Sequence, residues 1–131
     1  MPSSVSTVRV RYAETDKMGV VYYANYFVWF EVARAELLRS LGWSYREMEH
    51  AGVALPVIEA QCAYHRPAKY DDELDVKADG RMLSPVRMQF TYEVVRHEDA
   101  SIAASGRTVH AAVDAKGRPC RLPERIRQVF A

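Results

Sequence analysis

The sequence predicts an α+β fold in which one long helix covers a single antiparallel sheet of about five strands. One long segment has apolar residues at helical spacing, and the segments before and after it alternate between apolar and polar residues as strands do. The later strand segments are separated by short turns, which favours an antiparallel meander of four strands. One apolar helix can then bury one face of the sheet.

The first part of the chain is expected to form a strand, a long helix and a short helix. Apolar residues alternate with arginines over about residues 5 to 12, the period of a half-buried strand. Apolar residues then recur at steps of three and four from about residue 24 to residue 41, which predicts a helix that Gly42 ends. Ser44 to Glu47 fits a capping box and opens a short helix that Gly52 ends. The apolar positions of the long helix are Tyr26, Phe30, Ala33, Leu37 and Leu41.

The long helix should need a partner beyond its own sheet. Six aromatic residues fall between positions 22 and 30, so the first half of the helix is apolar around most of its circumference. A second copy of the chain is the simplest partner, which predicts a homodimer. On the outer side, Glu31 with Arg34 and Glu36 with Arg39 have the spacing of i to i+3 ion pairs.

The rest of the chain keeps the period of strands. Four segments alternate, less cleanly in the last: residues 58–65, 74–79, 86–94 and 102–113. Turn-forming residues separate them, and a last amphipathic turn or two is expected after Pro123. These four strands make up the expected meander.

Length and composition exclude several classes of protein. A chain of 131 residues predicts one domain over residues 1–131. A formal charge of +1 provides no excess of positive charge that would bind nucleic acid or an anionic membrane. The longest uncharged stretch, from Met18 to Phe30, is too short to cross a bilayer, and no secretory signal is visible, so a cytoplasmic location is expected. Two distant cysteines and four scattered histidines predict neither a disulfide nor a metal site, and no cofactor-binding motif is present.

Asp16 is the candidate for chemistry. It is a lone acidic residue before a glycine-containing bend and a helix start, whose first amides lack internal partners and can bind a developing oxyanion. A carboxylate beside such donors, walled by aromatic residues, has the parts that acyl transfer needs. The residues alone leave another interpretation open, in which Asp16 is an ordinary turn residue and Asn25 a helix cap.

A family resemblance favours the first interpretation. The segment from Asp16 to Tyr26, DKMGVVYYANY, resembles the D-x-x-G-[IV]-V-[YF]-x-x-x-Y signature of hotdog-fold acyl-CoA thioesterases of the 4-hydroxybenzoyl-CoA thioesterase type. Within that type the chain is most similar to the subgroup encoded with the Tol-Pal system. The likeness extends through Phe30-Glu31-x-x-Arg34 and Pro67-Ala68-x-Tyr70-Asp71-Asp72, from about residue 7 to residue 125. The first motif is specific, whereas the last mostly reflects a shared fold.

The resemblance implies a hotdog fold, an antiparallel sheet wrapped around one central helix, and hydrolysis of an acyl or aroyl CoA thioester without a cofactor. Asp16 takes the position of the catalytic base or nucleophile, and the backbone N–H of Tyr23 takes the position that polarises the thioester carbonyl. Many members of the subgroup have His at the position of Tyr23, a change that a backbone donor survives. The site is expected at the interface of a homodimer that forms a homotetramer.

The remaining site residues also follow from the resemblance. Arg81 and Arg87 are the nearest candidates for the CoA phosphates, although the basic run of the 4-hydroxybenzoyl branch is Ser84-Pro85-Val86 here. The acyl group is expected against residues of the loop and the first helical turn: Gly19, Val21, Tyr22, Tyr26 and Phe27.

Two other functions stay open. One is a hotdog hydratase or dehydratase, which typically needs a histidine, and none lies in the Asp16 loop or the first half of the helix. The other is a non-catalytic acyl-CoA-binding or scaffold protein.

Overall fold

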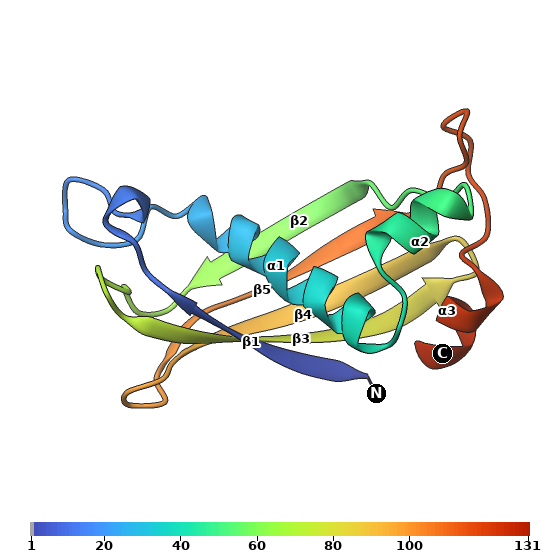
Figure 1. Cartoon of the computed structure of the whole chain (residues 1–131). Helices are drawn as coiled ribbons and strands as arrows, with labels where there is room; N and C mark the ends of the chain where they lie inside the picture. The colour runs from blue at the N-terminus through green and yellow to red at the C-terminus, as the bar shows by residue number, and fades with distance from the viewer. Residues whose placement is uncertain (1) are drawn as a thin grey trace.

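The structure, a computed structural model, describes residues 2–131 and has the α+β architecture that the sequence predicts. The long helix α1 lies across one face of a five-stranded antiparallel sheet in the order β1-β3-β4-β5-β2 (Figure 1). None of the helices over these residues is both long and apolar enough to cross a membrane. The elements are β1 (Ser3–Arg9), the 3-10 turn η1 (Tyr12–Glu14), α1 (Asn25–Ser40), α2 (Tyr45–His50), β2 (Val57–Tyr64), β3 (Glu73–Ser84), β4 (Arg87–Arg96), β5 (Ile102–Ala111) and α3 (Glu124–Val129).

The predicted four-stranded meander is wrong in one respect. Strands β3, β4 and β5 form a meander, but β2 pairs with β5 at the opposite edge of the sheet from β1. The reason is that β1 occupies the free side of β3: Val10 N–H donates to Asp72 O (2.9 Å), and Asp71 N–H donates to Val10 O (2.9 Å). Residues 65–72 are therefore a crossover from β2 to β3, and not a tight turn.

The first strand also differs from its predicted bounds. Strand β1 begins at Ser3 and ends at Arg9, after which Tyr12 to Glu14 already form η1. Serines occupy two of its inward positions, Ser4 and Ser6, so apolar alternation starts only near Val8. The predicted bounds of the strand, residues 5 to 12, therefore lie too far toward the C-terminus.

The core lies between α1 and the inner face of the sheet. Phe30 is fully buried and stacks on Tyr92, with ring centroids 4.2 Å apart and an interplanar angle of 5°. Gly106 makes this approach possible, because a Cβ at that position would lie 2.6 Å from the Phe30 ring and 2.5 Å from the Gln61 carbonyl oxygen. At the other end of the core, Phe130, which follows α3, packs closely over Gly80, because a Cβ at that position would lie 2.6 Å from the Phe130 ring.

One local prediction about α1 is wrong, and one interpretation that the sequence left open does not hold. The Glu36–Arg39 ion pair is present, but no Glu31–Arg34 pair occurs among residues 2–131. Arg34 turns inward instead, where its Nε donates to Tyr45 Oη at 3.0 Å. Asn25 does not cap the helix: Ala24 is the N-cap residue and supplies no side-chain bond, while Asn25 Nδ2 donates to the Glu14 carbonyl at 2.8 Å.

A buried chain of hydrogen bonds crosses the core from α1 to the loop before β2. Arg34 contacts Tyr92, whose Oη lies 2.6 Å from Thr108 Oγ1, and Thr108 Oγ1 lies 2.9 Å from His110 Nε2. The direction of donation is fixed at the far end of this chain, because His110 Nδ1 lies 2.9 Å from the Leu55 carbonyl oxygen, which can only accept. Every bond is satisfied when His110 is neutral with its proton on Nδ1. Burial lowers the pKa of His110 to about 4, so this neutral form prevails near pH 7.

Candidate active site

The loop between η1 and α1 is a closed turn built around Asp16. The Asp16 backbone N–H donates to Val20 O (2.8 Å), and the Gly19 N–H donates to Asp16 O (3.0 Å). Gly19 adopts φ +78°, a left-handed conformation that favours glycine. Asp16 Oδ1 accepts from the N–H of Met18 at 2.8 Å and of Val20 at 3.4 Å. The turn thus fixes the carboxylate, while Oδ2 has no hydrogen-bond partner within residues 2–131.

Two contacts hold this turn in place. Val21 N–H donates to the Ala68 carbonyl at 2.8 Å, which joins the loop to the crossover between β2 and β3. On the other side, the Glu14 carbonyl accepts from both Tyr22 N–H and Asn25 Nδ2, each at 2.8 Å. The loop is therefore attached to the start of α1 and to the crossover.

A cavity of about 300 Å³ lies beside the turn, and we call it the Asp16 cavity. Asp16 forms part of its wall, and aromatic and aliphatic side chains form much of the remainder. Four of the predicted site residues line it, namely Asp16, Val21, Tyr23 and Tyr26. The structure thus brings together the carboxylate, the candidate oxyanion donor and part of the expected acyl site.

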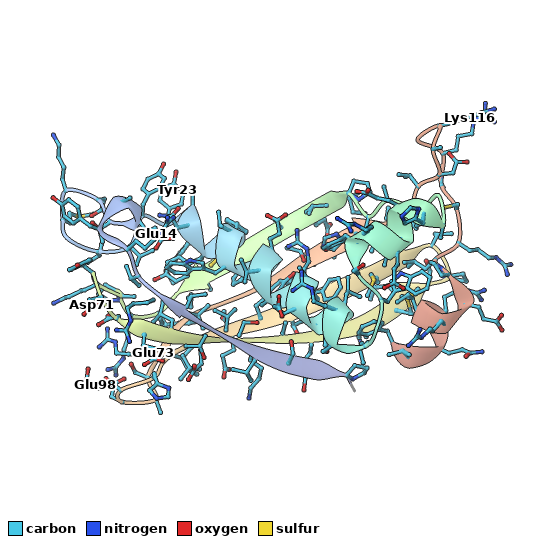
Figure 2. The ribbon with its side chains drawn as sticks, viewed as in Figure 1. Glu14, Tyr23, Asp71, Glu73, Glu98 and Lys116 are labelled. Carbon is cyan, nitrogen blue, oxygen red and sulfur yellow. The ribbon has the colours of Figure 1, made fainter. Side chains whose placement is uncertain are left out.

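The backbone of Tyr23 is positioned by a residue of β2. Tyr64 Oη donates to the Tyr23 carbonyl at 3.1 Å, and the Tyr64 ring lies edge-on to Tyr26 at a centroid distance of 5.4 Å. Burial raises the pKa of Tyr64 to about 12, so the hydroxyl stays a donor at neutral pH. Over residues 2–131 the Tyr23 N–H itself donates to no protein group, which leaves it available to a ligand oxygen. Figure 2 shows Tyr23 at the end of the molecule where the loop meets α1, near Glu14.

Three of the predicted acyl-site residues do not line the cavity. Gly19 is exposed in the turn, and Tyr22 is exposed with its ring 4.7 Å from that of Tyr23. Phe27 is half-buried and packs edge-on against Phe30 at 5.7 Å, as part of the core. The helical period explains this, because Phe27 lies about 100° around α1 from Tyr26 and so faces a different side.

Arg81 and Arg87 lie away from the Asp16 cavity of their own chain. Both are exposed near the hairpin between β3 and β4, where Arg81 pairs with Gln89 and Ser84 with Arg87. Strand β3 begins at the cavity end with Glu73, so Arg81 lies roughly 26 Å further along, at about 3.3 Å per residue. The structure gives no support for either arginine as a ligand of this cavity.

Sequence reasoning missed the far wall of the cavity. Tyr64, His65, Arg66 and Pro67 line it, together with Met18 and Val20 from the loop. His65 comes from the residues just after β2 and contacts Ser105 through its Nε2 at 2.8 Å. The sequence signal for this wall is the Pro67-Ala68 pair, which belongs to a motif that mostly reflects the shared fold. Among residues 2–131, no three His, Cys, Asp or Glu side chains gather closely enough to hold a metal ion.

Comparison with known proteins identifies the family. Residues 10–130 match the model of the thioesterase-like superfamily. The chain belongs to this superfamily. It is 36% identical over 122 residues to a putative esterase of Aquifex aeolicus, an alignment that covers 93% of each chain. It is 32% identical over 119 residues to the acyl-CoA thioester hydrolase YbgC of Escherichia coli O6:H1, covering 91% of this chain and 89% of that one.

A solved thioesterase structure extends the match to the fold. Slr0204, a 1,4-dihydroxy-2-naphthoyl-CoA thioesterase from Synechocystis, superposes with a TM-score of 0.91 at 25% identity, over 98% of this chain and 95% of that chain. The predicted hotdog fold is therefore confirmed. The predicted enzyme class, a thioester hydrolase, is confirmed by the same relatives.

Proposed function

We propose that this thioester hydrolase acts on an acyl or aroyl CoA thioester at the Asp16 cavity and releases the free acid and CoA. Asp16 and Tyr23 line one partly apolar cavity, and within residues 2–131 neither Asp16 Oδ2 nor the Tyr23 N–H has a hydrogen-bond partner. These two observations carry the proposal. The names of the relatives, acyl-CoA thioester hydrolase and naphthoyl-CoA thioesterase, support a CoA thioester as the substrate.

The geometry suits two routes that begin with the same contact. The thioester oxygen accepts the Tyr23 N–H, which stabilises the negative charge that develops as the carbonyl carbon becomes tetrahedral. Asp16 either removes a proton from the attacking water or attacks the carbon itself to form an anhydride that water then opens. In both routes the C–S bond breaks and the sulfur leaves as the CoA thiolate. Attack of water on the acyl carbon, of the thioester or of the anhydride, places its oxygen in the acid. Tyr64 acts as a positioning residue, because it holds the peptide of Tyr23 from its carbonyl side.

We also propose that two copies of the chain form a homodimer, and that dimers pair into a homotetramer. Strand β2 supports this, since it is an edge strand with almost every residue exposed, including Val57, Ile58 and Tyr64. Val28 and Val32 of α1 are likewise exposed, at 51% and 41%. Open apolar edges of this kind are usually covered by another chain.

Sedimentation of the wild-type protein at micromolar concentration tests the dimer. We expect a dimer or a larger species, and Ile58→Lys should shift it toward monomer because a charge on β2 opposes edge pairing. Val5→Lys is the matched control, since Val5 is exposed on the other edge strand, β1, and this variant should stay dimeric. A monomeric wild-type protein would contradict the proposal.

The finer identity is also proposed. The Asp16-to-Tyr26 motif supports the 4-hydroxybenzoyl-CoA thioesterase type and, within it, the Tol-Pal-associated subgroup. We further propose that residues 1–131 form one hotdog domain that acts in the cytoplasm without a cofactor. The match over residues 10–130 supports the single domain.

A hydratase is the second candidate function, and His65 is the observation that favours it. No histidine lies in the Asp16 loop or the first half of α1, but the residues just after β2 bring His65 to the cavity wall. A short enoyl-CoA such as crotonyl-CoA separates the two reactions. Hydrolysis predicts one free thiol for each substrate consumed, whereas hydration predicts a 3-hydroxyacyl-CoA and no thiol. Substrate loss without thiol would contradict the hydrolase mechanism. Binding of acyl-CoA without either product would favour the scaffold alternative.

A further inference from the structure

The middle of the crossover between β2 and β3 supports the turn around Asp16. Val20 and Lys69 form an isolated antiparallel bridge, and Val21 N–H donates to the Ala68 carbonyl at 2.8 Å. The Val20 carbonyl also closes the turn, because it accepts the Asp16 N–H at 2.8 Å. A displacement of the crossover backbone at Ala68 and Lys69 therefore moves the turn with it.

The two ends of the crossover are anchored to the sheet, and its middle is anchored by a side chain. The first two residues of the crossover donate their N–H groups to the backbone of β5, and its last residue accepts from the residue that follows β1. Pro67 has no N–H to donate. Within residues 2–131 its carbonyl accepts from one group, Arg96 Nη2, at 2.7 Å. The position of the Pro67 peptide thus depends on Arg96.

Arg96 is well placed to fix this peptide. It is the last residue of β4, the central strand of the sheet, and its side chain is 23% exposed. Its Nε lies 3.5 Å from Asp72 Oδ2 and its Nη1 lies 3.6 Å from Asp99 Oδ2, both of them ion-pair contacts. The bond to Pro67 is the one hydrogen bond that this side chain makes within residues 2–131. Two carboxylates therefore orient the guanidinium, and its hydrogen bond goes to the crossover.

The effect of Arg96 on the site is indirect. Pro67 contributes to the lining of the Asp16 cavity, whereas Arg96 borders a different hollow, among charged residues that include Glu73 and Glu98. Figure 2 shows these two glutamates at the same end of the molecule as Tyr23. Arg96 can thus influence the Asp16 cavity through the peptides of the crossover, without contact with a ligand there.

We propose that Arg96 is a positioning residue of the hydrolase. Its bond to Pro67 holds the middle of the crossover, and the crossover holds the Asp16 carboxylate and the Tyr23 N–H in the alignment that attack on the thioester needs. A displacement of reacting groups by about 1 Å can lower a rate by about a hundredfold, so a support at this distance from the chemistry can matter. This inference rests on the proposed function.

Arg96→Met keeps an apolar stem and removes the guanidinium. We expect kcat for thiol release from a CoA thioester to fall by at least about tenfold, because the alignment of the attacking group is lost. KM should stay unchanged, because the contacts that bind the ground state are kept. Hydrogen exchange followed by mass spectrometry is the second measurement. The amides of residues 16–23 should exchange faster, because the bond from Val21 to Ala68 opens more often.

Arg127→Met is the matched control. Arg127 is also half-buried, and its Nε donates to the Leu122 carbonyl at 2.9 Å. It belongs to α3, at the opposite end of the molecule from the loop before α1 (Figure 1). This variant loses the same kind of bond and should keep the wild-type kcat and the wild-type exchange over residues 16–23. Equal losses of kcat in both variants would show a general effect of stability and overturn the proposal.

Arg96→Lys tests the same point if the methionine variant fails to fold, since it keeps a positive charge near the two carboxylates. An ammonium group lacks the planar fork of arginine and cannot hold Pro67 and both carboxylates at once. We therefore expect a lower kcat and faster exchange over residues 16–23 here too. Wild-type kcat and exchange in Arg96→Lys would overturn the proposal, and so would a higher KM with an unchanged kcat in either variant.

Failure of the proposed function would look different. A wild-type protein that releases thiol from no CoA thioester would contradict the hydrolase activity, and with it the catalytic role of the alignment. Exchange does not depend on activity. Wild-type exchange over residues 16–23 in both Arg96 variants would refute the link from Pro67 to the Asp16 turn, even in a protein that hydrolyses thioesters.

Discussion

Asp16→Asn is expected to lower the rate of thiol release from a CoA thioester by at least about a hundredfold, the low end for loss of a positioned acid or base. The variant keeps the size of the side chain and an Oδ1 that accepts from Met18 and Val20, so the turn itself should persist. Only the negative charge and the basic Oδ2 are lost. Steady-state thiol release, compared with the wild type at equal concentration, measures the effect.

The chain contains a matched control for this variant. Asp114 forms the same turn: its N–H donates to Arg118 O (2.8 Å), its Oδ1 accepts from Lys116 and Arg118 N–H (2.9 and 3.0 Å), and Gly117 has φ +78°. This turn lies at the opposite end of the molecule from Tyr23, as Lys116 shows in Figure 2. Asp114→Asn should disturb its turn as much as Asp16→Asn does and leave thiol release unchanged. Equal activities of the two variants would remove Asp16 from the mechanism.

Acid is expected to destabilise the fold through His110. Burial, with a smaller effect of the Arg34 charge, lowers the pKa of His110 to about 4 in the folded state from an ordinary value of 6.5. Between these values the unfolded chain binds more protons, so the free energy of unfolding should decrease as the pH falls from about 6.5 to 4. The shift corresponds to about 3 kcal/mol at full effect. Below pH 4 both states are protonated at this site and its contribution stays constant.

Urea unfolding at a series of pH values measures this effect. His110→Gln removes the titration and should flatten the acid limb of the stability profile, although it also lowers stability at pH 7 because it breaks the bond to Thr108 or Leu55. His50→Gln changes an exposed histidine of α2 and should keep the wild-type profile. An unchanged acid limb in His110→Gln would show that other groups cause the acid sensitivity.

The sequence predicted the elements of the fold closely but not all of their neighbours. Helical spacing located α1 to within one residue at each end, because its buried face repeats without interruption from Tyr26 to Leu38. The position of β2 could not be read in the same way. Alternation shows that a segment is a strand, while the choice between β3 and β5 as its partner depends on β1 taking the free side of β3.

The same limit applies to the candidate site. Asp16 and Tyr23 lie within one short motif, so local sequence was enough to pair them. Tyr64 and His65 reach the cavity from the end of β2, about 40 residues after Tyr23, and no spacing rule relates them to Asp16. The sequence predicted an exposed ion pair for Arg34 because i to i+3 spacing is a rule for helix surfaces, whereas its partner is the hydroxyl of the half-buried Tyr45.

The most direct test of the central claim is a thiol-release screen of the wild-type protein against CoA thioesters of short, medium and long acyl chains and of aromatic acids. The Asp16 cavity and the superfamily predict that at least one of these esters yields CoA and free acid in equal amounts, with multiple turnovers and no added cofactor. Folded, oligomeric protein that releases thiol from none of them would contradict the claim that this cavity hydrolyses CoA thioesters.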